Sequence, residues 1–253
     1  MGAGHGHQLH YHGHSPVHRL PAHVKVVALL GFVLVVVATP RDRLWAFGAY
    51  AVLLVAVVLL THVPLGYLAK RMVVEVPFLG FALVLPFVAT GPTVDVGPVS
   101  LSQAGLWGSW GLLAKGTLGV AASLTLAATT EPRDLLAGLE QLRLPHQLVQ
   151  IMGFMMRYLE VVTGELHRMR VARESRGFRA SSVRAWPTLA ATAGALFIRS
   201  YERGERIHLA MLSRGYTGRL PQGRAAAASP AQWRQAGILP ALALTTLLLA
   251  VAR

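Results

Sequence analysis

The sequence lacks cysteine and is poor in charged residues. Its 253 residues include no cysteine, 14% charged residues and only three lysines among 24 basic residues. A chain without thiols has no disulfides, no thiolate zinc site and no cysteine nucleophile. A soluble domain has about 25% charged residues and disordered chains have low hydrophobicity, whereas 53% of this chain is hydrophobic. The composition therefore excludes both classes and indicates a membrane protein.

Two common catalytic motifs are also absent. The sequence contains neither a Gly-x-x-x-x-Gly-Lys-Ser/Thr phosphate-binding loop nor a His-Glu-x-x-His zinc motif. Such motifs place backbone amides on phosphates or paired imidazoles on zinc. We therefore expect a non-catalytic chain that has no catalytic residues and binds no cofactor.

Uncharged runs predict the membrane-spanning part. The bilayer core is about 30 Å thick, so a spanning helix needs about 20 mostly apolar residues. We predict an all-α polytopic membrane protein with about five transmembrane helices, four within residues 24–130 and the fifth at 236–253. Their apolar runs cover residues 26–40, 44–61, 76–91, 106–129 and 236–252. No signal peptide is expected, because a histidine-rich leader precedes the first run.

The basic residues predict the orientation. With the N-terminus inside, residues 1–25, 62–71 and 131–235 hold twenty basic residues, whereas the outer segments hold three. Lysine and arginine concentrate on the cytoplasmic side of membrane proteins. We therefore expect the N-terminus in the cytoplasm, with the arginines facing the lipid bilayer's headgroups and not nucleic acid.

Residues 131–235 are too polar for the membrane and too apolar for a solvated loop. After Glu131-Pro132, four leucines form a one-sided helical stripe up to Leu142. Longer helices are predicted from about His146 to Arg176 and from about Ser182 to Arg214. This segment should form a cytoplasmic bundle of one short helix and two long coupling helices.

Each of the two long helices ends in the same motif. Residues 172–178 and 210–216 both read Ala-x-x-Ser-Arg-Gly-aromatic. One interpretation is helix termination, because glycine adopts the left-handed conformation that ends many helices. The other is that each helix end presents an arginine to a soluble partner, since a guanidinium makes directional charged hydrogen bonds. Spacing alone leaves both open, and two such ends would suit a two-fold partner.

This repeat resembles the paired Ala-Arg-Gly-type motifs of the transmembrane coupling (T) component of energy-coupling factor (ECF) transporters. The segments 15–20 with Lys25, 130–136 and Arg157-Tyr158 resemble its cobalt/nickel branch, the CbiQ type. The resemblance covers about residues 15–220. It implies a bacterial inner (plasma) membrane protein whose coupling helices rest on two P-loop ATPase subunits, which bind ATP and magnesium.

The resemblance also implies roles for the motif residues. The tip arginines insert into grooves on the ATPases, and the helices pass ATP-driven closure to a separate substrate-capturing membrane subunit that imports cobalt or nickel ions. The implied ATPase-coupling residues are Ser175, Arg176, Gly177, Ser213, Arg214 and Gly215. Serine stands where the family often has alanine, but arginine and glycine are intact.

The leader, residues 1–23, is rich in histidine. It holds seven of the 11 histidines, and the pairs His5/His7 and His12/His14 are candidate ligands for a transition metal. The alternative is a flexible polar leader.

Two ionisable residues lie within the predicted spans. Intramembrane ionisable groups are functional candidates by default. Glu75 is interpreted as an interfacial partner of Lys70 and Arg71, and the sequence does not decide the partner of Lys115. A self-contained secondary transporter or channel for a divalent metal is the alternative function, and it should show paired ionisable residues and often a repeated half.

Overall fold

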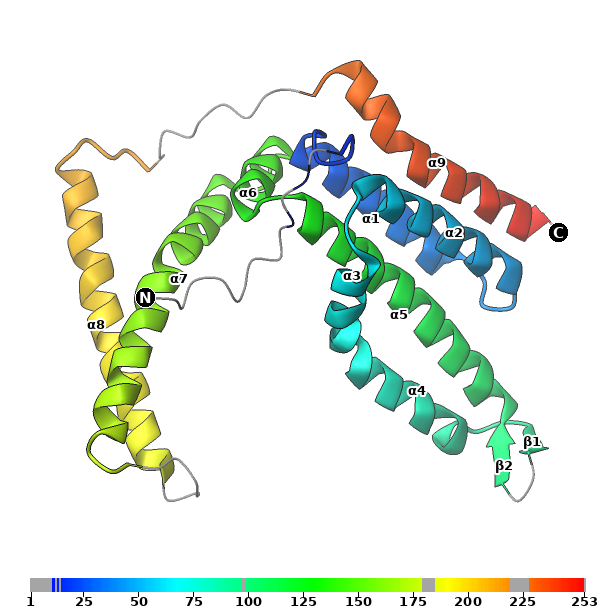
Figure 1. The fold of residues 1–253 in the computed structure, drawn as a ribbon, viewed down its shortest axis with the longest axis horizontal. Helices are drawn as coiled ribbons and strands as arrows, with labels where there is room; N and C mark the ends of the chain where they lie inside the picture. The colour runs from blue at the N-terminus through cyan, green and yellow to red at the C-terminus, as the bar shows by residue number, and fades with distance from the viewer. Residues whose placement is uncertain are drawn as a thin grey trace. The chain divides into compact units, whose positions relative to one another are not determined.

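A computed structural model describes residues 11, 13, 15–96, 99–178, 185–218 and 228–252. The chain divides into two compact units, residues 1–142 with 225–253, and residues 143–224. Helices make up nearly all of both units (Figure 1). The predicted all-α polytopic fold is confirmed.

The first unit packs around the long helix α5. In chain order its elements are α1 (Ala22–Ala38), α2 (Leu44–Thr61), α3 (Leu65–Arg71), the 3-10 helix η1 (Met72–Glu75), α4 (Val76–Val88), β1 (Thr93–Val96), β2 (Val99–Ser102), α5 (Gln103–Thr129), α6 (Pro132–Gln141) and α9 (Pro230–Ala252). Helices α1, α2 and α4 contact α5, while α9 lies along α1 and α2 and α6 packs on α1. Phe32, Phe47 and Tyr50 fill the main apolar core with edge-to-face ring contacts.

In the part of the chain that the structure describes, four helical segments are long and apolar enough to cross a membrane. They are Leu44–Thr61, Leu65–Val88, Gln103–Thr129 and Pro230–Ala252. The remaining predicted span corresponds to α1, a shorter apolar helix of 17 residues. At about 1.5 Å per residue, α1 is about 25 Å long, which covers most of the bilayer core.

Two helix starts and one hairpin differ from the sequence predictions. The third span begins at Leu65, so Lys70 and Arg71 lie in helix α3 and not in a loop. The 3-10 helix η1 then leads into α4. The first turn of α4 contains Pro77, and proline is tolerated there because the amide it lacks would have no partner within the helix. An unpredicted antiparallel hairpin pairs Thr93 with Ser102 before α5. The last helix begins at Pro230, several residues before the expected start.

Polar groups in the first unit find partners inside it. The Lys25 ammonium is buried, and it donates to the Thr129 carbonyl at 2.8 Å and to the Thr130 hydroxyl at 3.2 Å. The carbonyls at a helix end lack intrahelical partners. Lys25 therefore ties the start of α1 to the end of α5.

The second unit consists of α7 (His146–Glu174) and α8 (Trp186–Leu212), which run antiparallel and side by side (Figure 1). Their bounds agree with the two long helices expected from the sequence, and residues 182–184 of the expected second one lie outside the described residues. No residue of α8 is buried. This unit therefore leaves apolar surface uncovered.

Replacing Lys25 should destabilise the first unit. Lys25→Ala leaves the buried Thr129 carbonyl without its donor, so we expect the free energy of unfolding to fall by about 1–3 kcal/mol. The measurement is thermal or denaturant unfolding of the purified chain in detergent. The control is Lys70→Ala, because Lys70 is exposed; equal losses in both variants would contradict the prediction.

Candidate functional site

The end of α7 is closed by a left-handed glycine. Gly177 has a φ of 80°, a conformation that costs other L-residues about 1–2 kcal/mol. Its amide donates to the Glu174 carbonyl at 3.0 Å, and the Phe178 amide donates to the Arg173 carbonyl at 3.1 Å. These backward hydrogen bonds satisfy carbonyls of the last turn. Gly177 therefore closes the end of α7, and Arg176 is the last residue before this left-handed turn.

The end of α8 repeats this geometry. Gly215 has a φ of 81°, its amide donates to the Leu212 carbonyl at 3.0 Å, and the Tyr216 amide donates to the Met211 carbonyl at 3.0 Å. The sequence repeat is thus a structural repeat. Helix termination explains the glycine and the aromatic residue of each motif.

The serines match as well. The Ser175 hydroxyl donates to the Ala172 carbonyl at 3.0 Å, and the Ser213 hydroxyl donates to the Ala210 carbonyl at 2.9 Å. Each serine thereby satisfies a carbonyl that the helix end exposes. The first four residue types of the motif, Ala-x-x-Ser, contribute to one compact turn.

Helix termination does not account for the arginines. Arg176 and Arg214 each precede the left-handed glycine, and both side chains are exposed. Within the described parts of the chain, neither guanidinium has a hydrogen-bond acceptor or an acidic partner. Both are therefore available to bind carboxylates or carbonyls of another molecule.

One side chain at each tip makes a polar contact with the opposite helix: Tyr216 after α8 and Arg173 of α7. The Gln150 amide of α7 donates to the Tyr216 hydroxyl. At the other end, the Arg173 guanidinium lies 5.6 Å from the Phe178 ring centroid and donates to the Thr192 hydroxyl of α8 at 2.8 Å. The two tips therefore lie at opposite ends of the antiparallel pair, about 40 Å apart from the lengths of the helices.

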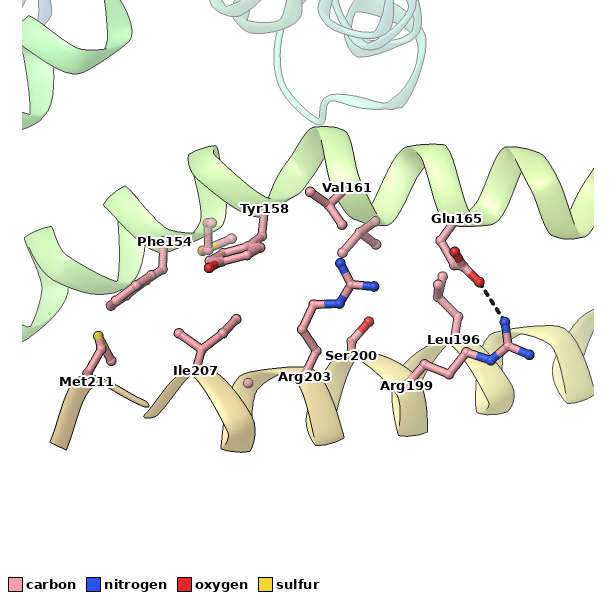
Figure 2. Close-up of a pocket in the computed structure, with 13 residues that line it drawn as sticks. Phe154, Tyr158, Val161, Glu165, Leu196, Arg199, Ser200, Arg203, Ile207 and Met211 are labelled. Atoms are coloured by element: carbon pink, nitrogen blue, oxygen red, sulfur yellow. Dashed lines mark hydrogen bonds and ion pairs between the residues drawn. The ribbon is translucent and has the colours of Figure 1, made fainter. Parts of the chain in front are cut away.

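A groove of about 340 Å³ runs between α7 and α8 (Figure 2). Its walls are mainly apolar, with arginine and glutamate at one end. The lining residues are Phe154, Met155, Tyr158, Val161, Val162, Glu165, Leu196, Arg199, Ser200, Arg203, Gly204, Ile207 and Met211. The apolar side chains of α7 and α8 that face this groove thus do not pack fully against each other.

Glu165 connects the two helices across this groove. Its Oε1 accepts from Arg199 Nη1 of α8 at 2.6 Å, and its Oε2 accepts from Arg168 Nη2 of α7 at 2.6 Å. Hydrogen bonds from Arg168 and Arg199 lower the pKa of Glu165. In the same way, the hydrogen bond from Arg170 lowers the pKa of Glu174. Both carboxylates therefore stay ionised at neutral pH.

Comparison with known proteins identifies the family. The family model for the cobalt transport protein CbiQ matches residues 13–224, which is most of the chain. The chain belongs to the CbiQ family. An energy-coupling factor transporter transmembrane protein EcfT from Bacillus selenitireducens is 30% identical over 224 residues, which cover 81% of each chain.

Other relatives agree with this assignment. An EcfT of Thermosediminibacter oceani is 26% identical, covering 90% of this chain and 92% of the relative. An uncharacterised Methanocaldococcus jannaschii protein is 37% identical over 112 residues, which cover 44% of this chain and 42% of that relative. The match to the CbiQ family model includes both tip motifs, so the repeat lies inside the region that defines the membership.

The predicted metal ligands His5, His7, His12 and His14 lie outside the described residues. Within the described residues, no group of three or more metal-ligating side chains exists. Just after the first pair, the Tyr11 amide donates to the Ala128 carbonyl at 2.8 Å. A metal site in the leader of this CbiQ-family chain therefore stays a prediction. The leader backbone at Tyr11 is bonded to the end of α5.

The two ionisable residues of the spans have local partners. Glu75 is 5% exposed, and its Oε1 accepts a hydrogen bond from the Thr117 hydroxyl of α5. Glu75 thus faces the interior of the first unit, and its predicted interfacial pairing with Lys70 and Arg71 stays a prediction. Lys115 donates to the Val37 carbonyl near the end of α1 at 2.7 Å. Both residues thus join helices of the first unit.

Sequence reasoning missed the cross-helix contacts of the second unit. Gln150, Glu165 and Arg199 bind residues 66, 34 and 34 positions away along the chain. Gln150 carried a weak signal, as a polar residue within an apolar stretch. No local pattern predicts the pairing of Glu165 with Arg199, because it depends on how α7 and α8 lie together.

Replacing either tip glycine should open the helix end. In Gly177→Ala and Gly215→Ala, the left-handed conformation strains the alanine by about 1–2 kcal/mol. This strain raises the equilibrium constant for local opening of the helix end by about 5–30-fold. Hydrogen exchange at the Phe178 and Tyr216 amides reports that opening. Gly153→Ala is the control, because Gly153 lies within α7 with nothing near its added Cβ; unchanged exchange in the tip variants would contradict the assigned closure.

Proposed function

We propose that this CbiQ-family chain is the transmembrane coupling component of an ECF-type importer for cobalt or nickel ions. In this proposal α7 and α8 rest on two P-loop ATPase subunits that bind ATP and magnesium. Closure of the ATPases on ATP moves the two helices, and a separate substrate-capturing membrane subunit receives that movement. The chain itself performs no catalysis.

One observation carries the proposal: two geometrically equivalent helix tips each expose an arginine that has no partner among the residues the structure describes. Charge-assisted hydrogen bonds from a guanidinium to a carboxylate are short and directional. A tip that is closed by glycine and joined to the opposite helix by a polar contact presents its guanidinium with little loss of conformational entropy on binding. The similarity to ECF transporter transmembrane proteins supports the transporter class, and membership of the CbiQ cobalt transport family supports cobalt as substrate.

Membership and topology support an inner-membrane location with a cytoplasmic N-terminus. The second unit, which we place in the cytoplasm, contains fourteen of the 21 arginines. Positive charge at this density favours the cytoplasmic side. The arginines of α7 and α8 are then available both to lipid headgroups and to protein partners.

The alternative, a self-contained divalent-metal carrier, has weaker support. Such carriers pair ionisable groups near the middle of the membrane. Here Glu75 contacts a threonine and Lys115 contacts a backbone carbonyl. Metal uptake by the isolated chain in liposomes, without any ATPase, would favour the carrier over the coupling component.

Removing both tip arginines should release the ATPase subunits. Each charged hydrogen bond contributes about 1.5–3 kcal/mol, so losing one bond at each tip weakens retention by at least about tenfold. The measurement is co-purification of the ATPases with the Arg176→Ala/Arg214→Ala double variant in detergent. Arg206→Ala is the control, because Arg206 is an exposed α8 residue whose Nε bonds its own helix. Full retention with normal metal uptake in the double variant would refute the proposal.

Removing the leader histidines should reduce metal binding and spare assembly. Imidazoles bind cobalt and nickel as neutral ligands, so deletion of residues 1–14 should lower binding of either ion by the purified chain. A variant with His5, His7, His12 and His14 changed to Gln keeps the backbone contact of Tyr11. Calorimetric titration measures binding; unchanged binding in both variants would show that the leader is not a metal site.

A further inference from the structure

The two long helices are joined by polar contacts more than by packing. The groove between α7 and α8 has about 340 Å³ and is open to solvent. Apolar side chains along an open groove stay in contact with water on that side and gain less free energy of burial. The apolar faces alone therefore hold the pair loosely.

Among the described residues, polar contacts cross the pair at both of its ends and between them. Those at the ends involve the tips: Arg173 with Thr192, and Gln150 with Tyr216. The contact of Glu165 with Arg199 lies between them and joins two full charges. It is about 16 Å from Arg176 along α7 and about 22 Å from Arg214 along α8, from the helical rise.

The geometry at Glu165 is that of a fixed carboxylate. Its side chain is 18% exposed, and both of its oxygens accept short hydrogen bonds from arginine. Arg168, one turn along α7, occupies one oxygen and holds the other toward α8. Figure 2 shows Glu165 and Arg199 pointing toward each other from opposite helices. An isolated surface ion pair contributes little, but a network with fixed geometry contributes more.

We propose that Glu165 is a positioning residue that locks α7 to α8 through Arg199, so that displacement of either tip moves both helices together. This inference rests on the proposed coupling function. Without the lock, the tips would still bind the ATPases, but the helices would slide along the open groove. ATP would then be hydrolysed with less ion movement.

The first test measures the lock on the purified chain, without any partner. The chain has no cysteine, so Arg157→Cys and Glu205→Cys, both at exposed positions, can carry the two spin labels that report the distance between α7 and α8. We expect Arg199→Gln and Glu165→Gln to broaden the distance distribution. Arg199→Lys should keep it narrow, because a single charged donor suffices for the Oε1 contact.

The matched control is Arg170→Gln. Arg170 forms a 2.7 Å ion pair with Glu174 inside α7, so the variant removes a comparable pair without a link to α8. Its distance distribution should stay narrow. Broadening in this control, or none in Arg199→Gln, would overturn the lock.

The second test measures coupling in proteoliposomes that contain the ATPases and the substrate-capturing subunit. Loss of the lock should lower the ions transported per ATP hydrolysed by about threefold to tenfold in Arg199→Gln and Glu165→Gln, while Arg170→Gln and Arg199→Lys stay within about twofold of the unchanged chain. ATPase retention should be normal in all four variants. A broadened distribution with an unchanged ratio, or a lowered ratio with an unchanged distribution, would overturn the positioning role.

Failure of the coupling function itself gives a different result. In that case the Arg176→Ala/Arg214→Ala variant retains the ATPases, whatever the spin labels show. Loss of helix content by circular dichroism in Glu165→Gln would assign Glu165 to folding and overturn the proposal, unless Arg199→Gln and Arg199→Lys still differ in coupling.

Discussion

The candidate site depends on how two helices end. A left-handed residue at Gly177 and at Gly215 turns the chain back on the last turn, and only glycine adopts that conformation without strain. The arginine before each glycine therefore stands at the limit of its helix, with no further turn beside it. Its exposure follows from the backbone.

The basic residues divide by type between two kinds of contact. Lys25 and Lys115 each donate to a backbone carbonyl at the end of a neighbouring helix. A compact ammonium on a flexible stem can reach such a carbonyl. The second unit has arginine and no lysine. Among its described residues, Arg168, Arg170 and Arg199 form ion pairs with glutamate, Arg173 donates to a threonine of the opposite helix, and the tip arginines are exposed. Arginine is thus found where planar, directional contacts between helices or molecules are made.

Much of the fold could be predicted from the sequence because it is locally encoded. Apolar runs gave the spans, and the repeat gave the ends of α7 and α8. The early start of α9 also had a local signal: Ser229 and Gln232 cap each other's amides around Pro230. The pairing of Glu165 with Arg199 had none, since it arises from tertiary packing. Neither the coupling role of the tips nor the leader's metal binding follows from the fold, because both depend on other molecules.

The antiparallel course of α7 and α8 has a consequence for assembly. Turning the pair by half a revolution about an axis between the helices exchanges the Arg176 end with the Arg214 end, and the backbone closure at each end is the same. Two copies of one partner protein would therefore each bind an equivalent helix end. The alanine, serine, arginine and glycine that the two repeats share therefore encode neither an order of arrival nor a preference between the copies. Any asymmetry in the finished assembly originates at the three positions where the repeats differ or in residues outside them.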